Sequence, residues 1–128
     1  QIMNIAIIGT GNVGGTLAAH WATAGHRIFL GVRSPESFKG QALTQLPRVS
    51  VHPIAEAVAA AEVALLAVPA TAAIETAQAL GDTTGKIIID SMNIVMGRGP
   101  AGFRTTAEAI LAHTASREVV KCFNTTGF

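Results

Sequence analysis

A glycine-rich turn near the amino terminus sets the architecture of the chain, and it reads Gly9-Thr10-Gly11-Asn12-Val13-Gly14. Residues 4–8 before it are mostly apolar and β-branched, which predicts a buried strand. Residues 13–24 after it repeat apolar side chains at helical spacing, and Gly25 follows as a stop signal. The spacing G-x-G-x-x-G between a strand and a helix is typical of a dinucleotide-binding βαβ unit.

Each glycine of the turn has a separate expected role. Gly9 allows the tight turn, Gly11 lets the backbone approach a pyrophosphate because it lacks a Cβ atom, and Gly14 lets the helix pack close to the strand. The N–H groups and the dipole at the helix start favour an anion there. We therefore predict a cofactor-binding turn over residues 9–14. The alternative is a glycine turn that serves packing alone.

Strand and helix patterns alternate along the rest of the chain. The predicted strands after the first are residues 26–32, 48–52, 62–68, 86–90 and 118–123. The predicted helices after the first are residues 34–46, 53–61, 71–80 and 105–115, with a long loop over 92–103. This alternation predicts an α/β fold: one Rossmann-type domain over residues 1–128, with a doubly wound parallel sheet of about six strands.

Composition supports this fold and excludes several classes of protein. Hydrophobic residues make up 49% and charged residues 13% of the 128 residues, the opposite of the balance in long disordered segments. One cysteine, Cys122, excludes an internal disulfide framework, and a net charge of +1 argues against a nucleic-acid partner. The most apolar stretch, residues 55–74, contains Glu56, Glu62 and Pro69, so we expect no membrane segment. Without a visible signal peptide, we expect a cytoplasmic protein.

The residues after the second strand indicate which cofactor binds. An NAD site usually places an acidic residue about 20 positions beyond the fingerprint, to bind the ribose 2′-hydroxyl. Here the strand ends in Gly31-Val32-Arg33-Ser34. Arg33 can hold a 2′-phosphate with charge-assisted hydrogen bonds, and Ser34 can add a hydroxyl. We therefore predict NADP(H) rather than NAD(H). The alternative is that Arg33 is solvated and Ser34 caps a helix.

The ends of the later strands complete the predicted cleft. Apolar residues follow the fourth strand, and we expect them to form a wall for the ribose or nicotinamide: Ala67, Val68, Pro69 and Ala70. Asn93 after the fifth strand and Asn124 after the sixth can hydrogen-bond the nicotinamide amide or a substrate, although asparagine also serves in loops. The four histidines lack the spacing of a metal site, so no metal is predicted. His52 is the histidine nearest the expected cleft.

No general acid or base stands out, so the catalytic residues remain unknown. The chain has no tyrosine, and Lys39 and Lys86 are not at strand ends. Hydride transfer between two ring cofactors depends on alignment more than on proton catalysis, because each cofactor carries its own chemistry. The sequence therefore favours that reaction over the reduction of a simple ketone.

These motifs together resemble the NADP-binding domain of the coenzyme F420-dependent NADP oxidoreductase family. The resemblance spans essentially the whole chain, and it is carried by residues 5–14, 31–34, 85–90 and 120–125. The oxidoreductase domain of the STEAP metalloreductases is similar, and pyrroline-carboxylate reductases are related. The resemblance implies that Thr10, Arg33 and Ser34 contact the 2′-phosphate and that residues 68–70 line the nicotinamide end.

The resemblance also implies an activity: hydride exchange between NADP(H) and a small-molecule redox acceptor, coenzyme F420 or a flavin. Two departures stand out. Ile94 follows Asn93 where the family often has proline, and family members continue past the sixth strand into a helical segment that builds the substrate cleft and a homodimer. We expect either a fragment or a bare cofactor-binding domain. Two alternatives stay open: an imine or hydroxy-acid reductase with catalytic residues in a missing C-terminal domain, or a non-catalytic NADP(H) sensor.

Overall fold

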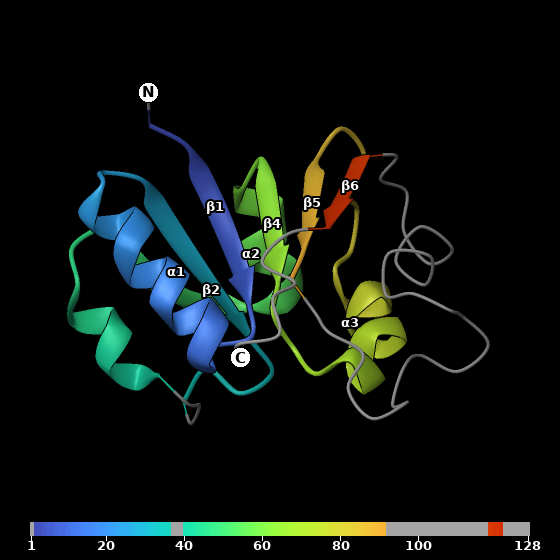
Figure 1. Cartoon of the computed structure of the whole chain (residues 1–128), viewed down its shortest axis with the longest axis horizontal. Coiled ribbons are helices and arrows are strands. Elements are labelled where there is room, and N and C mark those ends of the chain that lie inside the picture. Colours follow the sequence, from blue (N-terminus) through green and yellow to red (C-terminus); the bar gives the residue numbers. More distant parts are fainter. Residues whose placement is uncertain (1, 37–39, 92–117, 122–128) are drawn as a thin grey trace.

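Six parallel strands form the single sheet of the computed structural model, which describes residues 2–36, 40–91 and 118–121. Their order across the sheet is β3-β2-β1-β4-β5-β6, and every neighbouring pair runs parallel. The strands are β1 (Asn4–Ile8), β2 (Arg27–Val32), β3 (Val49–Pro53), β4 (Val63–Leu66), β5 (Ile87–Asp90) and β6 (Glu118–Lys121). The predicted doubly wound Rossmann sheet is therefore confirmed (Figure 1).

Strand β1 lies at the centre and explains why residues 4–8 are so apolar. It pairs with β2 on one side and with β4 on the other, so both of its edges are hydrogen-bonded. Helices cover both faces, and residues 5–8 are all buried. A strand buried on both faces has no polar alternation, which is the pattern that the sequence shows.

Helix α1 (Asn12–Thr23) covers one face of the sheet (Figure 1). Ile5 and Ile7 of β1 point to this face and pack with Ala18 and Ala22 of the helix. Leu43 joins the same cluster from the segment that follows β2. Each fully buried isoleucine or leucine here stabilises the fold by roughly 1.5–3 kcal/mol.

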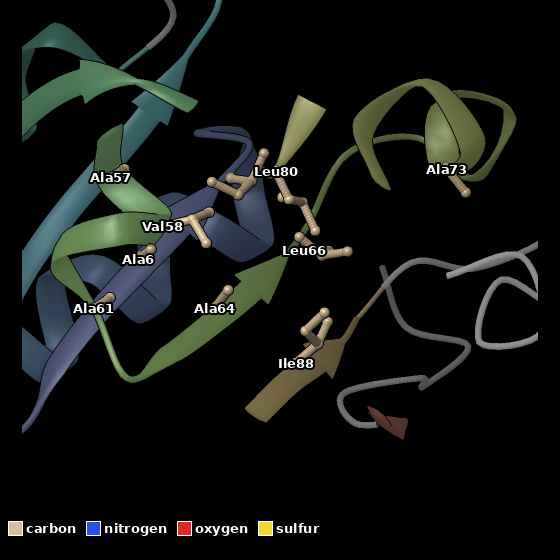
Figure 2. Packing of buried hydrophobic residues seen from close by; sticks show 10 residues of the cluster. Ala6, Ala57, Val58, Ala61, Ala64, Leu66, Ala73, Leu80 and Ile88 are labelled. Carbon is tan, nitrogen blue, oxygen red and sulfur yellow. The ribbon is translucent and has the colours of Figure 1, made fainter. Parts of the chain in front are cut away.

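The opposite face is covered by α2 (Ile54–Ala60) and α3 (Ala73–Ala79) (Figure 2). Ala6 of β1 and Ala57 of α2 are both completely buried. Their small side chains allow the helix to approach the sheet closely. The complete cluster of buried residues is Ala6, Ile8, Ala57, Val58, Ala61, Ala64, Leu66, Ala73, Leu80 and Ile88.

The α-helix predicted over residues 34–46 is wrong. Pro35 and Glu36 lie in a turn, and the regular element that follows is a short 3₁₀ helix, η1 (Gln41–Gln45). Gly40, at the N-cap of η1, has a φ of +92°, which is the left-handed conformation and cannot belong to an α-helix. The helix start signal at Ser34-Pro35 was therefore misleading, because a helix from there to residue 46 would have to include Gly40.

The other predicted elements match the structure to within a few residues, and a 3₁₀ turn, η2 (Ala70–Ala72), precedes α3. The loop predicted over 92–103 and the helix predicted over 105–115 lie outside the described residues, as does Cys122. Within the described part of the chain, no helix has the length and apolar character needed to cross a membrane.

The strand order places the topological switch point between β1 and β4. From β1 the chain builds outward to β2 and β3, and it then returns to add β4, β5 and β6 on the other side. In open α/β sheets, ligands bind outside the carboxyl ends of the strands at this point. The candidate site is therefore expected where β1, β2 and β4 end.

Candidate functional site

The glycine turn joins β1 to α1, and two of its glycines are required by close packing. Gly9 has a φ of +102°, and a Cβ atom there would lie 2.7 Å from the backbone of Ala67 after β4. At Gly14 a Cβ atom would lie 1.9 Å from the carbonyl oxygen of Gly9. These distances confirm the tight turn and the close helix–strand packing that the sequence predicts.

Gly11 differs from both neighbours in the motif, because a Cβ atom there would meet no atom within 4 Å. It is exposed and occupies the N-cap position of α1, so no side chain caps the first-turn N–H groups of this helix. An open backbone at a helix start is the geometry that a pyrophosphate requires. Packing does not explain the glycine at position 11, whereas a bound pyrophosphate would.

A cleft opens beside the turn, at the carboxyl ends of the strands. Its volume is about 330 Å³, within the range of small-molecule sites. Residues from β1, the glycine turn, the end of β2, α2, the β4–α3 connection and α3 line it: Ile8, Gly9, Thr10, Gly31, Val32, Arg33, Ile54, Val68, Pro69, Ala72 and Thr76. Most of these side chains are apolar, so the cleft suits a flat ring held by a few polar contacts.

Five of the predicted site residues line this cleft: Gly9, Thr10, Arg33, Val68 and Pro69. The others lie around it or outside the described part. Gly11 and Ser34 are exposed, and Gly14 is buried under the turn. The remaining positions are Asn12 and Val13 at the start of α1, Ala67 after β4, and Ala70 in η2. Asn93 and Asn124 lie outside the described residues.

Several residues that line the cleft were not predicted from the sequence. Ile54 is the first residue of α2, and Ala72 and Thr76 come from the segment after β4. Their signal was available in part, because Ile54 and Ala72 each lie within about one helical turn of a predicted strand end. Thr76, which is 2% exposed, was hidden because a buried threonine in a helix resembles an ordinary core position.

The charged pair at this site joins Arg33, the residue directly after β2, to Glu75 of α3. Nη2 of Arg33 lies 3.3 Å from Oε2 of Glu75, which stands in the first turn of α3. The two side chains are 65% and 67% exposed. Such an exposed pair contributes at most about 1 kcal/mol to stability, so a stronger anion can displace the carboxylate from Arg33. The sequence has no acidic residue directly after β2, but the fold supplies Glu75 from 42 positions further along the chain.

His52 lies on the edge strand β3 and does not belong to the lining of the cleft. Its Nε2 lies 2.8 Å from Oγ of Ser50, and its Nδ1 lies 3.9 Å from Oε2 of Glu56. The centroid of the His52 ring also lies 5.6 Å from the centroid of the Phe29 ring. In the described ranges, no three histidine, cysteine or acidic side chains gather in a way that could hold a metal ion.

The switch-point cleft and the glycine turn define a class of protein, the Rossmann-type dinucleotide-binding domains. Within this class, the family of coenzyme F420-dependent NADP oxidoreductases matches residues 4–94. Since this match covers well over half of the sequence, the chain belongs to that family. The resemblance drawn from its motifs is thereby confirmed.

Solved structures agree. A protein of Arthrobacter sp. FB24, assigned as an F420-dependent NADP reductase, is 30% identical, with a TM-score of 0.82 over 96% of this chain and 63% of its own. A protein of Sinorhizobium meliloti is 28% identical, with a TM-score of 0.78 over 96% and 62%. An imine reductase from Pseudomonas sp. is 22% identical, with a TM-score of 0.69 over 88% and 37%, and shares the fold. The chain thus spans somewhat less than two thirds of the length of the first two.

Proposed function

We propose that the chain binds NADP(H) across the carboxyl ends of β1, β2 and β4, with its pyrophosphate at Gly11 and its 2′-phosphate at Arg33. The observation that carries this proposal is the position of Arg33, which lines the cleft from the end of β2 on the same side as the open glycine turn. A guanidinium binds phosphate through charge-assisted, often bidentate hydrogen bonds. Family membership supports the same cofactor.

In this proposal the chain's residues bind and align the cofactor. Val68 and Pro69 give the cleft an apolar wall, and the backbone N–H groups at the start of α1 hold the pyrophosphate. The bound nicotinamide supplies the hydride, and the acceptor is a deazaflavin such as F420, or a flavin. None of the described residues that line the cleft is an evident general acid, which fits this reaction, since ring-to-ring hydride transfer depends mainly on alignment.

The test is calorimetric titration with NADPH and, separately, NADH. We expect NADPH to bind more tightly than NADH. Arg33→Ala should weaken NADPH binding about 10- to 100-fold, the loss of one or two charge-assisted hydrogen bonds, and leave NADH within about twofold. Arg27→Ala is the matched control, because Arg27 is an exposed arginine at the other end of the same strand. Equal losses for both nucleotides would remove the 2′-phosphate from Arg33.

The acceptor is tested by following NADPH oxidation with F420, with a flavin and with a cyclic imine. Turnover of F420 or flavin supports the proposal. Turnover of the imine alone favours the reductase alternative, whose fold the Pseudomonas imine reductase shares. Tight NADPH binding without turnover of any acceptor, in this chain and in a longer one that includes the length its relatives have, favours a cofactor-sensing module.

A further inference from the structure

We propose that Glu75 is a specificity-determining residue of the cofactor site: its carboxylate competes with the 2′-phosphate for Arg33 and so limits the preference for NADP(H) over NAD(H). This inference rests on the proposed cofactor site. It adds a residue from a different element, α3, which acts in the direction opposite to Arg33.

The position of the ion pair carries the argument. Arg33 lines the cleft from β2, and Thr76, the neighbour of Glu75, lines it from α3. The contact between Arg33 and Glu75, 3.3 Å from Nη2 to Oε2, therefore links two walls of the same cleft. A phosphate that reaches the guanidinium must come within a few ångströms of this carboxylate, because both anions use the same donor group.

Charge decides the sign of the effect. A phosphate monoester carries about 1.5 to 2 negative charges at neutral pH, so it binds arginine more strongly than a single carboxylate does. Bound phosphate and Glu75 then repel each other, and phosphate binding also breaks the existing ion pair. NADH has a neutral 2′-hydroxyl and meets neither cost. Glu75 therefore lowers the affinity for NADPH and leaves that for NADH nearly unchanged.

Exposure decides the size of the effect. Both side chains are about two thirds exposed, so water and salt screen the repulsion. Removing the charge of Glu75 should raise the NADPH-over-NADH selectivity about three- to tenfold, as expected for charges of this size a few ångströms apart near a surface. Glu75 thus moderates the selectivity that Arg33 creates and does not reverse it.

The experiment compares the wild-type chain with Glu75→Gln, which keeps the size of the side chain. Dissociation constants are measured for NADPH, NADH and adenosine 2′,5′-bisphosphate at low and at physiological salt. We expect Glu75→Gln to bind NADPH and the bisphosphate about three- to tenfold more tightly, with NADH within twofold and a smaller gain at the higher salt. Glu62→Gln, which removes the same charge at the opposite end of the sheet, should change no ratio.

A double-mutant cycle separates competition for Arg33 from a general charge effect. In an Arg33→Ala background, Glu75→Gln should raise NADPH affinity clearly less than it does in the wild-type chain, because the competition for Arg33 is gone and only the repulsion between carboxylate and phosphate remains. An unchanged selectivity in Glu75→Gln would overturn the inference. Weaker NADPH binding would also overturn it, since Glu75 would then be positioning Arg33 for the phosphate. Failure of the wild-type chain to bind either nucleotide would instead sink the cofactor site itself, and the inference with it.

Discussion

The two ends of the sheet are built from different chemistry. At the amino ends of the strands, side chains hold backbone groups in fixed places: Nδ1 of His26 accepts the N–H of Met3, and a carboxylate oxygen of Glu62 accepts the N–H of Asn4. Nζ of Lys86 donates to the carbonyl oxygen of Ala61. These bonds join segments that are between 23 and 58 residues apart in the sequence.

The carboxyl ends of β1 and β2 are instead built from glycine and small apolar residues, with an exposed ion pair at the margin. Gly9 and Gly14 allow close contact between backbone segments, whereas Gly11 borders an open space. The amino ends of the strands therefore close the fold, whereas the carboxyl ends leave backbone donors for a ligand. Substitutions at the two ends should therefore separate stability from cofactor binding.

The largest expected effect on stability is that of Gly14→Ala. The new methyl group would stand 1.9 Å from the Gly9 carbonyl oxygen, and backbone on both sides must shift to admit it. We expect the free energy of unfolding, measured in urea, to fall by about 3 kcal/mol. Gly15→Ala is the control, because its methyl group would meet no atom closer than 3.5 Å; it should be neutral or stabilise the helix by up to about 1 kcal/mol. Equal effects at both positions would contradict the packing role of Gly14.

Gly11→Val should have the opposite profile. Its side chain enters the open space over the helix start and blocks a pyrophosphate from the backbone, so binding of NADPH and of NADH should both weaken at least about 100-fold. Stability should fall by less than about 1 kcal/mol, the scale of an N-cap change. Titration calorimetry and urea unfolding of the same preparation measure both. Retained affinity for both nucleotides would place the pyrophosphate elsewhere.

Sequence alone was enough for the fold and for half of the cleft. The glycine spacing in residues 9–14 and the apolar run in residues 4–8 are local patterns, and they predict a strand, a turn and a helix with few alternatives. Arg33, Val68 and Pro69 could be named because switch-point ligands lie at strand ends. Local pattern and global fold agree at each of these positions.

The remainder depended on contacts that no local pattern carries. Glu75 of α3 meets Arg33 only in the folded chain, and no local sequence pattern links these two residues, which are 42 positions apart. The failed helix over residues 34–46 shows the same limit, since Gly40 has a left-handed backbone and a Cβ atom there would lie 3.2 Å from Thr10, a residue of the distant glycine turn. An ion pair between distant residues, or a positive φ angle that depends on tertiary packing, can be seen only in the assembled fold.

Arg48 lies at the amino end of β3, and its side chain and its backbone conformation can be tested separately. It is the described non-glycine residue with a positive φ, +68°, and its Nη2 donates to the Ala22 carbonyl oxygen at 3.0 Å. Arg48→Ala removes the hydrogen bond and keeps the left-handed backbone, so unfolding free energy should fall by about 1–2 kcal/mol. Arg48→Gly should be about 1 kcal/mol more stable than Arg48→Ala, because glycine adopts this conformation without strain. NADPH affinity should stay within twofold of wild type in both variants. If Arg48→Gly is no more stable than Arg48→Ala, the backbone at this position is unstrained.

The smallest expected effect is at Asp82, in the turn before β5. The N–H of Thr84 donates to Oδ1 of Asp82 at 3.0 Å, and this hydrogen bond lowers the pKa of the carboxyl below its ordinary value. A lowered pKa in the folded state means that the charged form stabilises the fold above pH about 4, and that this contribution is lost as the pH falls through the lowered pKa. Wild type should therefore exceed Asp82→Asn in stability by the same small amount at pH 5 and pH 7, and the difference should shrink toward zero in urea titrations below pH 4. A difference that persists there would show that the charge of Asp82 does not cause it. NADPH affinity at pH 7 should be the same in both proteins, because the turn precedes β5 at the amino ends of the strands.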